Sequence, residues 1–229
     1  KIELMDINFS EKLQNLNQEI KKHLKCPYEN FKLIIVTKTQ DNKEISEIIK
    51  LGHKVFAENY VEEAIKKIDH FKKKDLEWHF IGRIQSNKVK KICKYFDWVQ
   101  TICSERHATI LDNECQKMNK NMNICIQINI DNEESKSGIQ INNLNNFIKN
   151  ISSLKNITIR GLMAIPSKTN ILKEKEDSYT ILRLAFEKLN TEMKDFDTLS
   201  IGMSNDYICA LQNGSTMLRI GQYIFGERK

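Results

Sequence analysis

The chain has 229 residues, of which 40% are hydrophobic and 29% charged, with a formal net charge of +6; this balance is typical of a globular protein. No apolar run approaches the roughly 18 residues that a membrane-spanning helix needs, and the acidic residues near the start predict no secretory signal. The six cysteines form no C-x-x-C pair, so we expect buried free thiols and a cytoplasmic location.

Basic residues gather at residues 66–67, 72–74 and 88–94. A surface that binds nucleic acid would interleave such residues with aromatic residues or glycines on one exposed face. Here they lie in segments of helical period that also carry acidic residues, which indicates solvated helix faces. We therefore expect neither a nucleic acid nor a membrane among the partners.

In chain order, short apolar segments alternate with longer segments of helical period. The first helix is expected over residues 10–25, with Ser10 as its N-cap and Glu11 in its first turn. Further helices are expected near residues 43–51, 60–73, 86–95, 104–120, 141–153, 171–194 and 205–212. The strands between them are predicted at Leu33–Thr37, Val55–Glu58, Trp78–Ile81, Trp98–Thr101, Ile124–Ile130, Thr158–Ala164, Leu199–Met203 and Met217–Ile220.

These strands are rich in Ile, Val and Leu with weak alternation, as in parallel strands covered by helices. Their number predicts an α/β fold, a single (β/α)8 TIM-type barrel with an extra N-terminal helix. A doubly wound open sheet shows the same alternation and is the structural alternative. Because no linker is evident, residues 1–229 are expected to form one barrel domain, on which the helical segment 1–30 packs.

Lys38 follows the apolar run Leu33–Val36 and stands at a strand end, where parallel α/β folds bind ligands. Partial burial of its stem would disfavour the ammonium form and lower the lysine pKa, which yields the neutral amine that forms a Schiff base with an aldehyde. From this context alone, a surface lysine is the better interpretation.

Two later segments offer a phosphate site. After Gly202, either Ser204 or Asn205 would cap the next helix, whose free backbone N–H groups would meet an anion. At the end of the eighth strand, Arg219 supplies a positive charge and Gly221 allows close approach of the backbone. Taken singly, these features fit an ordinary helix cap and a glycine at the edge of the core.

Other motifs give weaker or negative evidence. His79 stands alone in an apolar strand, where a histidine is usually hydrogen-bonded within a core, and without ligands at suitable spacing it predicts no metal site. The sequence has no Walker-type loop, no G-x-G-x-x-G and no G-x-S-x-G. Nucleotide binding by those motifs and serine hydrolysis therefore lack support.

Several motifs follow one another from residue 33 to the C-terminus: VTKT at 36–39, FAENYV at 56–61, WHFIGRIQSNK at 78–88, ESKSG at 134–138, RGLMAIP at 160–166, LSIGMSND at 199–206 and GSTMLRIGQYIFG at 214–226. In this order they resemble the pyridoxal phosphate homeostasis protein family. Members of that family resemble the barrel domain of alanine racemase standing alone.

The resemblance implies that Lys38 holds pyridoxal 5′-phosphate through a Schiff base. It also implies that Arg219 lies beside the pyridine nitrogen, and that Ser204 and the backbone around Gly221 bind the phosphate. The residues that it implies line or support the site are Asn59, His79, Met163, Ser200 and Met203. Thr37, Gln40 and Ala57 depart from the Ser, Pro and Gly common in the family, and none of these departures removes a residue expected to touch the cofactor.

The function that the resemblance implies is pyridoxal phosphate homeostasis, meaning binding, buffering or delivery of the cofactor, with apo-enzymes that use it as possible recipients. The alternative is an amino-acid racemase, which needs a second base that alanine racemase supplies from an additional β-domain. The sequence ends at Lys229, so we expect no such domain, no robust catalysis, no catalytic residue and a monomer. A Schiff-base aldolase is a third hypothesis, which would leave the phosphate elements unexplained.

Overall fold

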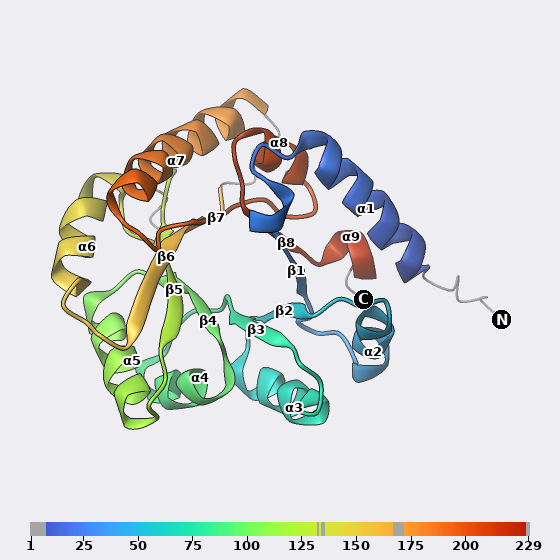
Figure 1. The fold of residues 1–229 in the computed structure, drawn as a ribbon, viewed down its shortest axis with the longest axis horizontal. Coiled ribbons are helices and arrows are strands. Elements are labelled where there is room, and N and C mark those ends of the chain that lie inside the picture. The colour runs from blue at the N-terminus through green and yellow to red at the C-terminus, as the bar shows by residue number, and fades with distance from the viewer. Residues whose placement is uncertain (1–7, 132, 134–135, 167–171, 228–229) are drawn as a thin grey trace.

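The computed structural model describes residues 8–131, 133, 136–166 and 172–227, and these form a closed barrel of eight parallel strands (Figure 1). The strands pair in chain order, and the last pairs with the first to close the barrel. The predicted (β/α)8 fold is confirmed, and the open sheet is excluded. The strands are β1 (Lys32–Val36), β2 (Val55–Glu58), β3 (Glu77–Phe80), β4 (Trp98–Ile102), β5 (Met122–Ile128), β6 (Ile157–Ala164), β7 (Thr198–Ser200) and β8 (Met217–Ile220).

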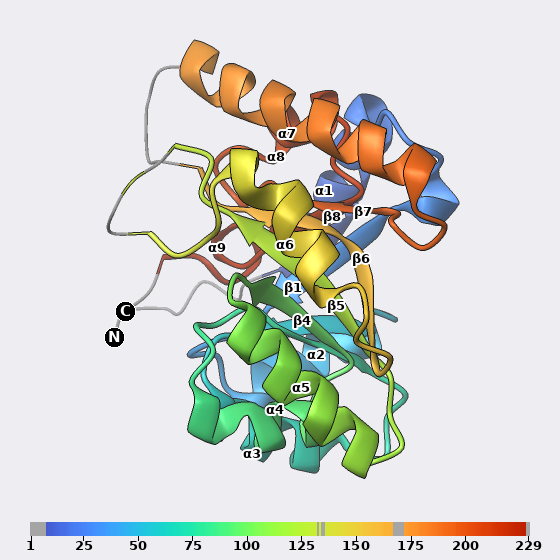
Figure 2. The same ribbon diagram turned by 90° about the vertical axis from the view of Figure 1, so that its left-hand side faces the viewer.

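Helices surround the barrel (Figures 1 and 2). They are α1 (Phe9–His23), α2 (Asn42–Lys50), α3 (Val61–Phe71), α4 (Val89–Tyr95), α5 (Glu105–Lys117), α6 (Leu144–Ile151), α7 (Leu172–Glu192), α8 (Tyr207–Gln212) and α9 (Gln222–Phe225), with 3₁₀ turns η1 (Tyr28–Asn30), η2 (Ser86–Lys88) and η3 (Ile141–Asn143). The predicted extra helix is α1, which packs against α2, α8 and α9. Within the described residues, no helix has the length and hydrophobicity needed to cross a membrane.

Some predicted boundaries were wrong. The N-cap of α1 is Asn8, whose side chain accepts a hydrogen bond from the backbone N–H of Glu11 at 3.0 Å, so Ser10 lies inside the helix. The seventh strand ends at Ser200, because the chain turns at Gly202 with a φ of +96°. Helix α9 was not predicted, since its four residues are too few for a periodic pattern.

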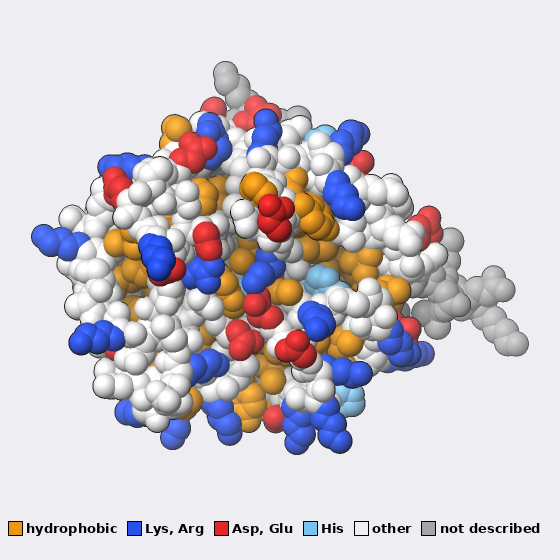
Figure 3. All heavy atoms as spheres, viewed as in Figure 1, with side chains coloured by type: hydrophobic (Ala, Val, Ile, Leu, Met, Phe, Trp, Pro, Cys, Tyr) orange, Lys and Arg blue, Asp and Glu red, His pale blue; other side chains and the backbone are white. Residues whose placement is uncertain are grey.

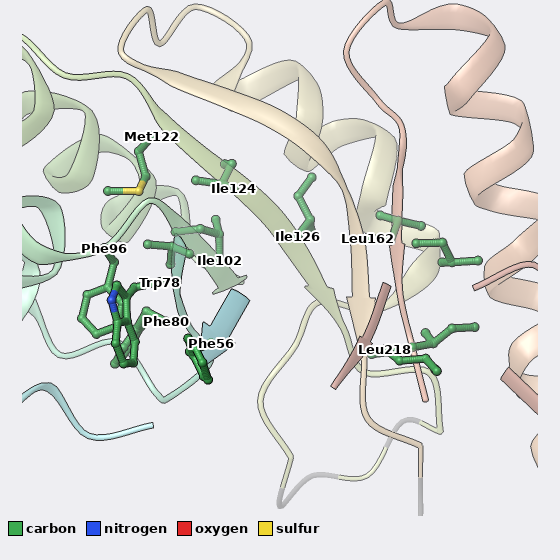
Figure 4. Close-up of a cluster of buried hydrophobic side chains, with 14 of the residues drawn as sticks. Phe56, Trp78, Phe80, Phe96, Ile102, Met122, Ile124, Ile126, Leu162 and Leu218 are labelled. Atoms are coloured by element: carbon green, nitrogen blue, oxygen red, sulfur yellow. The ribbon is translucent and has the colours of Figure 1, made fainter. Parts of the chain in front are cut away.

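Side chains alternate along the strands between the helices and the barrel interior. The outward-facing side chains fill the space under the helices and form the main hydrophobic core (Figure 4). Full burial of one large apolar side chain contributes about 1.5–3 kcal/mol, so this layer supplies most of the driving force for folding. Labelled members are Phe56, Trp78, Phe80, Phe96, Ile102, Met122, Ile124, Ile126, Leu162 and Leu218.

The barrel interior is partly polar. A small apolar cluster, which includes Ile34, Trp98 and Met163, lies there. Buried polar side chains from β3, β4, β7 and β8 are joined by hydrogen bonds that cross the interior. The interior therefore fixes polar groups in position rather than serving only as a core.

The two ends of the barrel differ. The strands β5 and β6 run toward one end, on the left in Figure 2. Figures 1 and 3 view the opposite end, where charged side chains of both signs gather near the centre. Ion pairs at the strand starts join Lys32 to Glu77, with Nζ and Oε1 2.7 Å apart, and Arg160 to Asp197. The end at which the strands begin thus carries paired charges.

Candidate functional site

A pocket of about 540 Å³ lies at the carboxyl ends of the strands, between the segments that follow β1, β7 and β8. This is the end at which barrels of this type bind their ligands, and the volume suits a cofactor-sized molecule. The side chains of the lining that bear on function are Lys38, Gln40, Asn59, Met163, Met203, Ser204, Arg219, Gln222 and Phe225.

Lys38 lies two residues beyond the end of β1, and its side chain is half-buried in the pocket wall. The next residue, Thr39, has a φ of +66°, which is a strained conformation for a β-branched residue. Its backbone N–H donates to Oε1 of Glu63 on α3 at 2.6 Å. Helix α3 therefore holds the turn that directs Lys38 into the pocket.

A buried ion cluster, which we call the Lys67 cluster, lies beneath Lys38 and consists of Thr37, Glu58, Glu63 and Lys67. The ammonium of Lys67 donates to the carbonyl oxygen of Thr37 at 2.6 Å and to one oxygen each of Glu58 and Glu63, at 2.7 and 2.6 Å. Burial raises the pKa of Glu58, and the charge and hydrogen bond of Lys67 oppose that rise. The cluster therefore holds the backbone before Lys38, at Thr37, and after it, at Thr39.

The segment after β7 is joined to the segment after β8. The hydroxyl oxygen of Ser204 accepts a hydrogen bond from the backbone N–H of Tyr223 at 3.0 Å. Asp206 is the N-cap residue of α8, and its carboxylate accepts from the backbone N–H of Met203 at 2.6 Å. The prediction that Ser204 or Asn205 caps this helix was therefore wrong, and the O–H of Ser204 remains a donor at the pocket wall.

Two glycines allow close backbone contacts around the pocket. A Cβ at Gly221 would lie 3.2 Å from the carbonyl oxygen of Val36, and one at Gly82 would lie 1.9 Å from the carbonyl oxygen of Asn59. Asn59 lines the pocket, and its Oδ1 is buried without a hydrogen-bond partner in the described part of the chain. An unpaired buried amide oxygen at a pocket wall is an acceptor that a polar ligand can use.

Arg219 is the buried cation of the pocket, with 3% of its surface exposed. Its Nη1 donates to both the carbonyl oxygen and the hydroxyl oxygen of Ser200, at 2.7 and 2.6 Å, and its Nη2 donates to the carbonyl oxygen of Ala164 at 2.9 Å. Burial lowers the pKa of Arg219, but a guanidinium in a protein stays charged at neutral pH. The group is therefore a fixed positive charge.

A hydrogen-bond chain, here called the Arg219–Glu77 chain, continues from Ser200 through the barrel interior. Ser200 Oγ donates to Gln100 Oε1 at 2.7 Å, and Gln100 Nε2 donates to His79 Nδ1 at 2.9 Å. Burial lowers the pKa of His79 and the hydrogen bond with Glu77 opposes that change, so the ring is neutral near pH 7 and its Nε2–H donates to Glu77 at 2.6 Å. These hydrogen bonds thus link Arg219 in the pocket to Glu77 at the end of the barrel where the strands begin.

Most of the predicted site residues lie together. Lys38, Asn59, Met163, Met203, Ser204, Arg219 and Gly221 line one pocket. His79 and Ser200 do not line it; they belong to the Arg219–Glu77 chain beneath it and support the site through Arg219. No three His, Cys, Asp or Glu side chains among the described residues converge as metal ligands.

Sequence reasoning missed Gln100 and Lys67, on which the site depends. Gln100 is a polar residue inside the apolar strand β4, a signal like that of His79 in β3. Lys67 lies on the buried face of α3, three residues after Ala64 and four before Phe71, so its helical position marks it as buried. The pocket residues Gln222 and Phe225 lie on α9, which was not predicted.

Stability in acid should depend on Glu77. Burial alone would raise its pKa, but the hydrogen bond and the charge of His79, followed by the hydrogen bond and the charge of Lys32, lower the pKa to about 2, from an ordinary 4.5. A depressed carboxyl pKa contributes stability that is present above pH 4.5 and is lost as the pH falls toward 2. Glu77→Gln should therefore flatten the decline in the free energy of unfolding over that range, measured by urea titration at each pH. The surface variant Glu47→Gln is the control. If the free energy of unfolding falls as steeply with pH in Glu77→Gln as in Glu47→Gln and the unsubstituted chain, this role of Glu77 is wrong.

The chain matches the family model described as alanine racemase, N-terminal domain, over residues 10–229. The pyridoxal phosphate homeostasis protein of Pasteurella multocida is 42% identical over 225 residues, which cover 96% of each chain. The protein of the same name from Escherichia coli K12 is 42% identical over 203 residues, 87% of each chain. This chain belongs to the pyridoxal phosphate homeostasis protein family. The family predicted from the motifs is thereby confirmed.

A solved structure of a more distant relative supports the same fold. The structure of PipY from Synechococcus elongatus PCC7942, with PLP bound, superposes with a TM-score of 0.83 at 29% identity. The match covers 95% of this chain and 100% of PipY. The barrel observed here is thus the fold of a protein whose structure contains that cofactor.

Proposed function

We propose that this chain binds pyridoxal 5′-phosphate in the pocket, with Lys38 as the point of covalent attachment, and that it acts in intracellular homeostasis of the cofactor by binding, buffering or delivering it. The names of its relatives and the PLP-bound structure of PipY support this proposal. The observation that carries it is the meeting in one pocket of an amine, a fixed guanidinium, a hydroxyl and a glycine, from Lys38, Arg219, Ser204 and Gly221.

The residues present fit this cofactor. Pyridoxal phosphate supplies an aldehyde that condenses with amines and a pyridine ring that withdraws electrons. In the proposal, the amine of Lys38 is the nucleophile for the aldehyde, while the O–H of Ser204 and the backbone around Gly221 bind phosphate oxygens. Asn59 Oδ1, buried without a partner in the described chain, accepts a hydrogen bond from the ligand.

The role of Arg219 favours a binding protein over an enzyme. We propose that its guanidinium faces the pyridine nitrogen, because Arg219 is the buried cation in the pocket wall and is held there by Ser200 and Ala164. A permanent positive charge at that position keeps the ring nitrogen unprotonated and so weakens electron withdrawal from an attached amine. This property supports a chain that retains the cofactor without robust catalysis of its own.

The setting of the proposed function is cytoplasmic. All six cysteines are free thiols, including Cys93 and Cys115, whose Sγ atoms lie 3.1 Å apart without a disulfide, and this supports a reducing compartment. We propose a monomer, because the exposed large hydrophobic side chains are scattered over several elements. Apo-enzymes that use the cofactor are the proposed recipients.

Replacing Lys38 tests the proposal directly. The purified chain should take up pyridoxal phosphate with a visible absorbance band, and borohydride should fix one cofactor on the peptide that contains Lys38, as read by mass spectrometry. Lys38→Ala should lose that band, because it lacks the amine that attaches the cofactor, while the surface control Lys66→Ala should keep it. An unchanged band in Lys38→Ala would sink the proposal.

A second assay separates the binding protein from a racemase-like enzyme. The cofactor-loaded chain is incubated with L-alanine, and formation of the D enantiomer is measured by chiral chromatography. We expect none above the rate of free pyridoxal phosphate. Robust exchange of enantiomers would leave the cofactor assignment intact and overturn the non-enzymatic function.

A further inference from the structure

A second cavity, of about 480 Å³, adjoins the proposed cofactor pocket. We call it the Arg83 chamber. It is lined by the segments after β3 and β4, by the first turn of α5, by β5 and by residues 136–138, and it shares Ile81 and Ile165 with the cofactor pocket. The chamber therefore lies at the ligand-binding end of the barrel, against the first pocket, and has room for a small molecule of its own.

The walls of the chamber are fixed by hydrogen bonds. Thr101 Oγ1 donates to the carbonyl oxygen of Gly82 at 2.7 Å, which joins the ends of β3 and β4. The side chain of Gln127 donates to the carbonyl oxygen of Ser137 at 3.0 Å, and the backbone N–H of Ile139 donates to the carbonyl oxygen of Gln127 at 2.9 Å. The cavity is thus part of the folded framework rather than a gap between loose loops.

The ionisable side chains of the described lining are basic or neutral, and none is acidic. Lys136 is already paired with Glu133, with Nζ and Oε1 3.0 Å apart. Partial burial and the charges of Arg106 and Arg83 lower the pKa of His107, so this ring is neutral near pH 7. Arg83 forms no hydrogen bond or ion pair with any residue in the described part of the chain. Arg83 is exposed, and among the described residues its guanidinium is a positive charge at the chamber wall without an acidic partner.

We propose that the Arg83 chamber binds a small aliphatic carboxylate, with the carboxylate on the guanidinium of Arg83. A guanidinium presents parallel N–H donors that match the two oxygens of a carboxylate. Ser104, whose hydroxyl makes no capping bond on α5, offers a further donor. The side chains of Ile81, Ile84 and Ile165 supply an apolar wall for a short carbon chain. The site is distinct from Lys38 and does not depend on the cofactor.

Binding of isobutyrate to the full-length chain tests this proposal, with saturation-transfer NMR and calorimetry as the readouts. Isobutyrate should bind saturably, whereas the neutral amide isobutyramide should not compete with it. Arg83→Gln should weaken binding by about tenfold or more, as expected for loss of a charge-assisted hydrogen-bond pair. Arg106→Gln, on the neighbouring surface of α5 and outside the lining, is the matched control and should bind normally.

Two further arms make the outcome decisive. Lys38→Ala should retain isobutyrate binding, so failure of the cofactor proposal leaves this one standing. Inorganic phosphate should compete poorly; equal competition would overturn the carboxylate class. Absence of saturable binding, or equal affinity in the unsubstituted chain and Arg83→Gln, would overturn the site itself.

Discussion

Lys67→Met should lower the free energy of unfolding by about 3–5 kcal/mol, the usual cost of removing one partner from a buried ion pair. Methionine keeps most of the volume of the lysine stem but leaves the carboxylate of Glu58, which is fully buried, without its cation. It also removes the bond to the carbonyl oxygen of Thr37. Because that bond holds the residue before Lys38, cofactor affinity should fall as well. Urea denaturation and a cofactor titration measure the two effects.

The pH dependence and the control variants test whether the unpaired carboxylate of Glu58 causes the loss of stability in Lys67→Met. Burial already raises the pKa of Glu58, and without Lys67 it should rise further. The loss of unfolding free energy in Lys67→Met should therefore be largest at pH values above the raised pKa of Glu58. It should shrink at lower pH, where Glu58 takes up a proton. Adding Glu58→Gln should restore part of the stability, and Lys66→Met on the exposed face of α3 should cost little. Equal stabilities of the Lys66 and Lys67 variants would contradict the role of the cluster.

Gly82→Ala should destabilise the chain by about 3 kcal/mol or more, at or above the upper end for overpacking a tight site. The new Cβ would lie 1.9 Å from the carbonyl oxygen of Asn59. Because the backbone fixes the position of a Cβ and the oxygen is itself a backbone atom, a strand end has to move. Since Asn59 lines the pocket, cofactor affinity should fall together with stability. Thermal or urea unfolding and a cofactor titration provide the measurements.

Gly52→Ala is the matched control for this substitution. Gly52 has a φ of +88°, and no heavy atom lies within 4 Å of the position that an added Cβ would take. Alanine there should therefore lower the free energy of unfolding by only about 1–2 kcal/mol, the cost of a left-handed backbone conformation. Gly52 lies away from the pocket lining, so the substitution should leave cofactor affinity unchanged. If the two alanine variants are equally stable and bind the cofactor equally well, close contact at Gly82 is not what positions Asn59.

The barrel could be predicted because its signals are local. Each strand is a short apolar run and each long helix has a clear period, so Val55–Glu58 and Met217–Ile220 were predicted with the bounds that the structure shows. Errors arose at helix starts. Asn8 rather than Ser10 caps α1, and α8 has Asp206 rather than Ser204 at its N-cap position, where the Asp206 side chain makes no capping bond. Neighbouring polar residues have similar capping propensities, so sequence alone does not choose between them.

The pocket and two of its supporting residues, His79 and Ser200, were predictable from the family motifs, but the contacts that hold them in place were not. Lys67 and Glu58 lie nine positions apart and read as ordinary helix and strand residues, and only the fold brings their charges together. Gln100 and Ser200 are a hundred positions apart and meet across the barrel interior. Such contacts depend on which strands face one another, which a local pattern does not encode.

The Arg219–Glu77 chain also constrains how the sequence can change. Each of its bonds has a fixed donor and acceptor, so replacing Gln100 or His79 alone leaves a buried group unpaired, at a cost of about 1–3 kcal/mol. A tolerated change at one position therefore requires a compensating change at the next. Within the family, we expect positions 79, 100, 200 and 219 to vary together and to be inherited as a unit, although the side chains at 79 and 100 do not line the pocket.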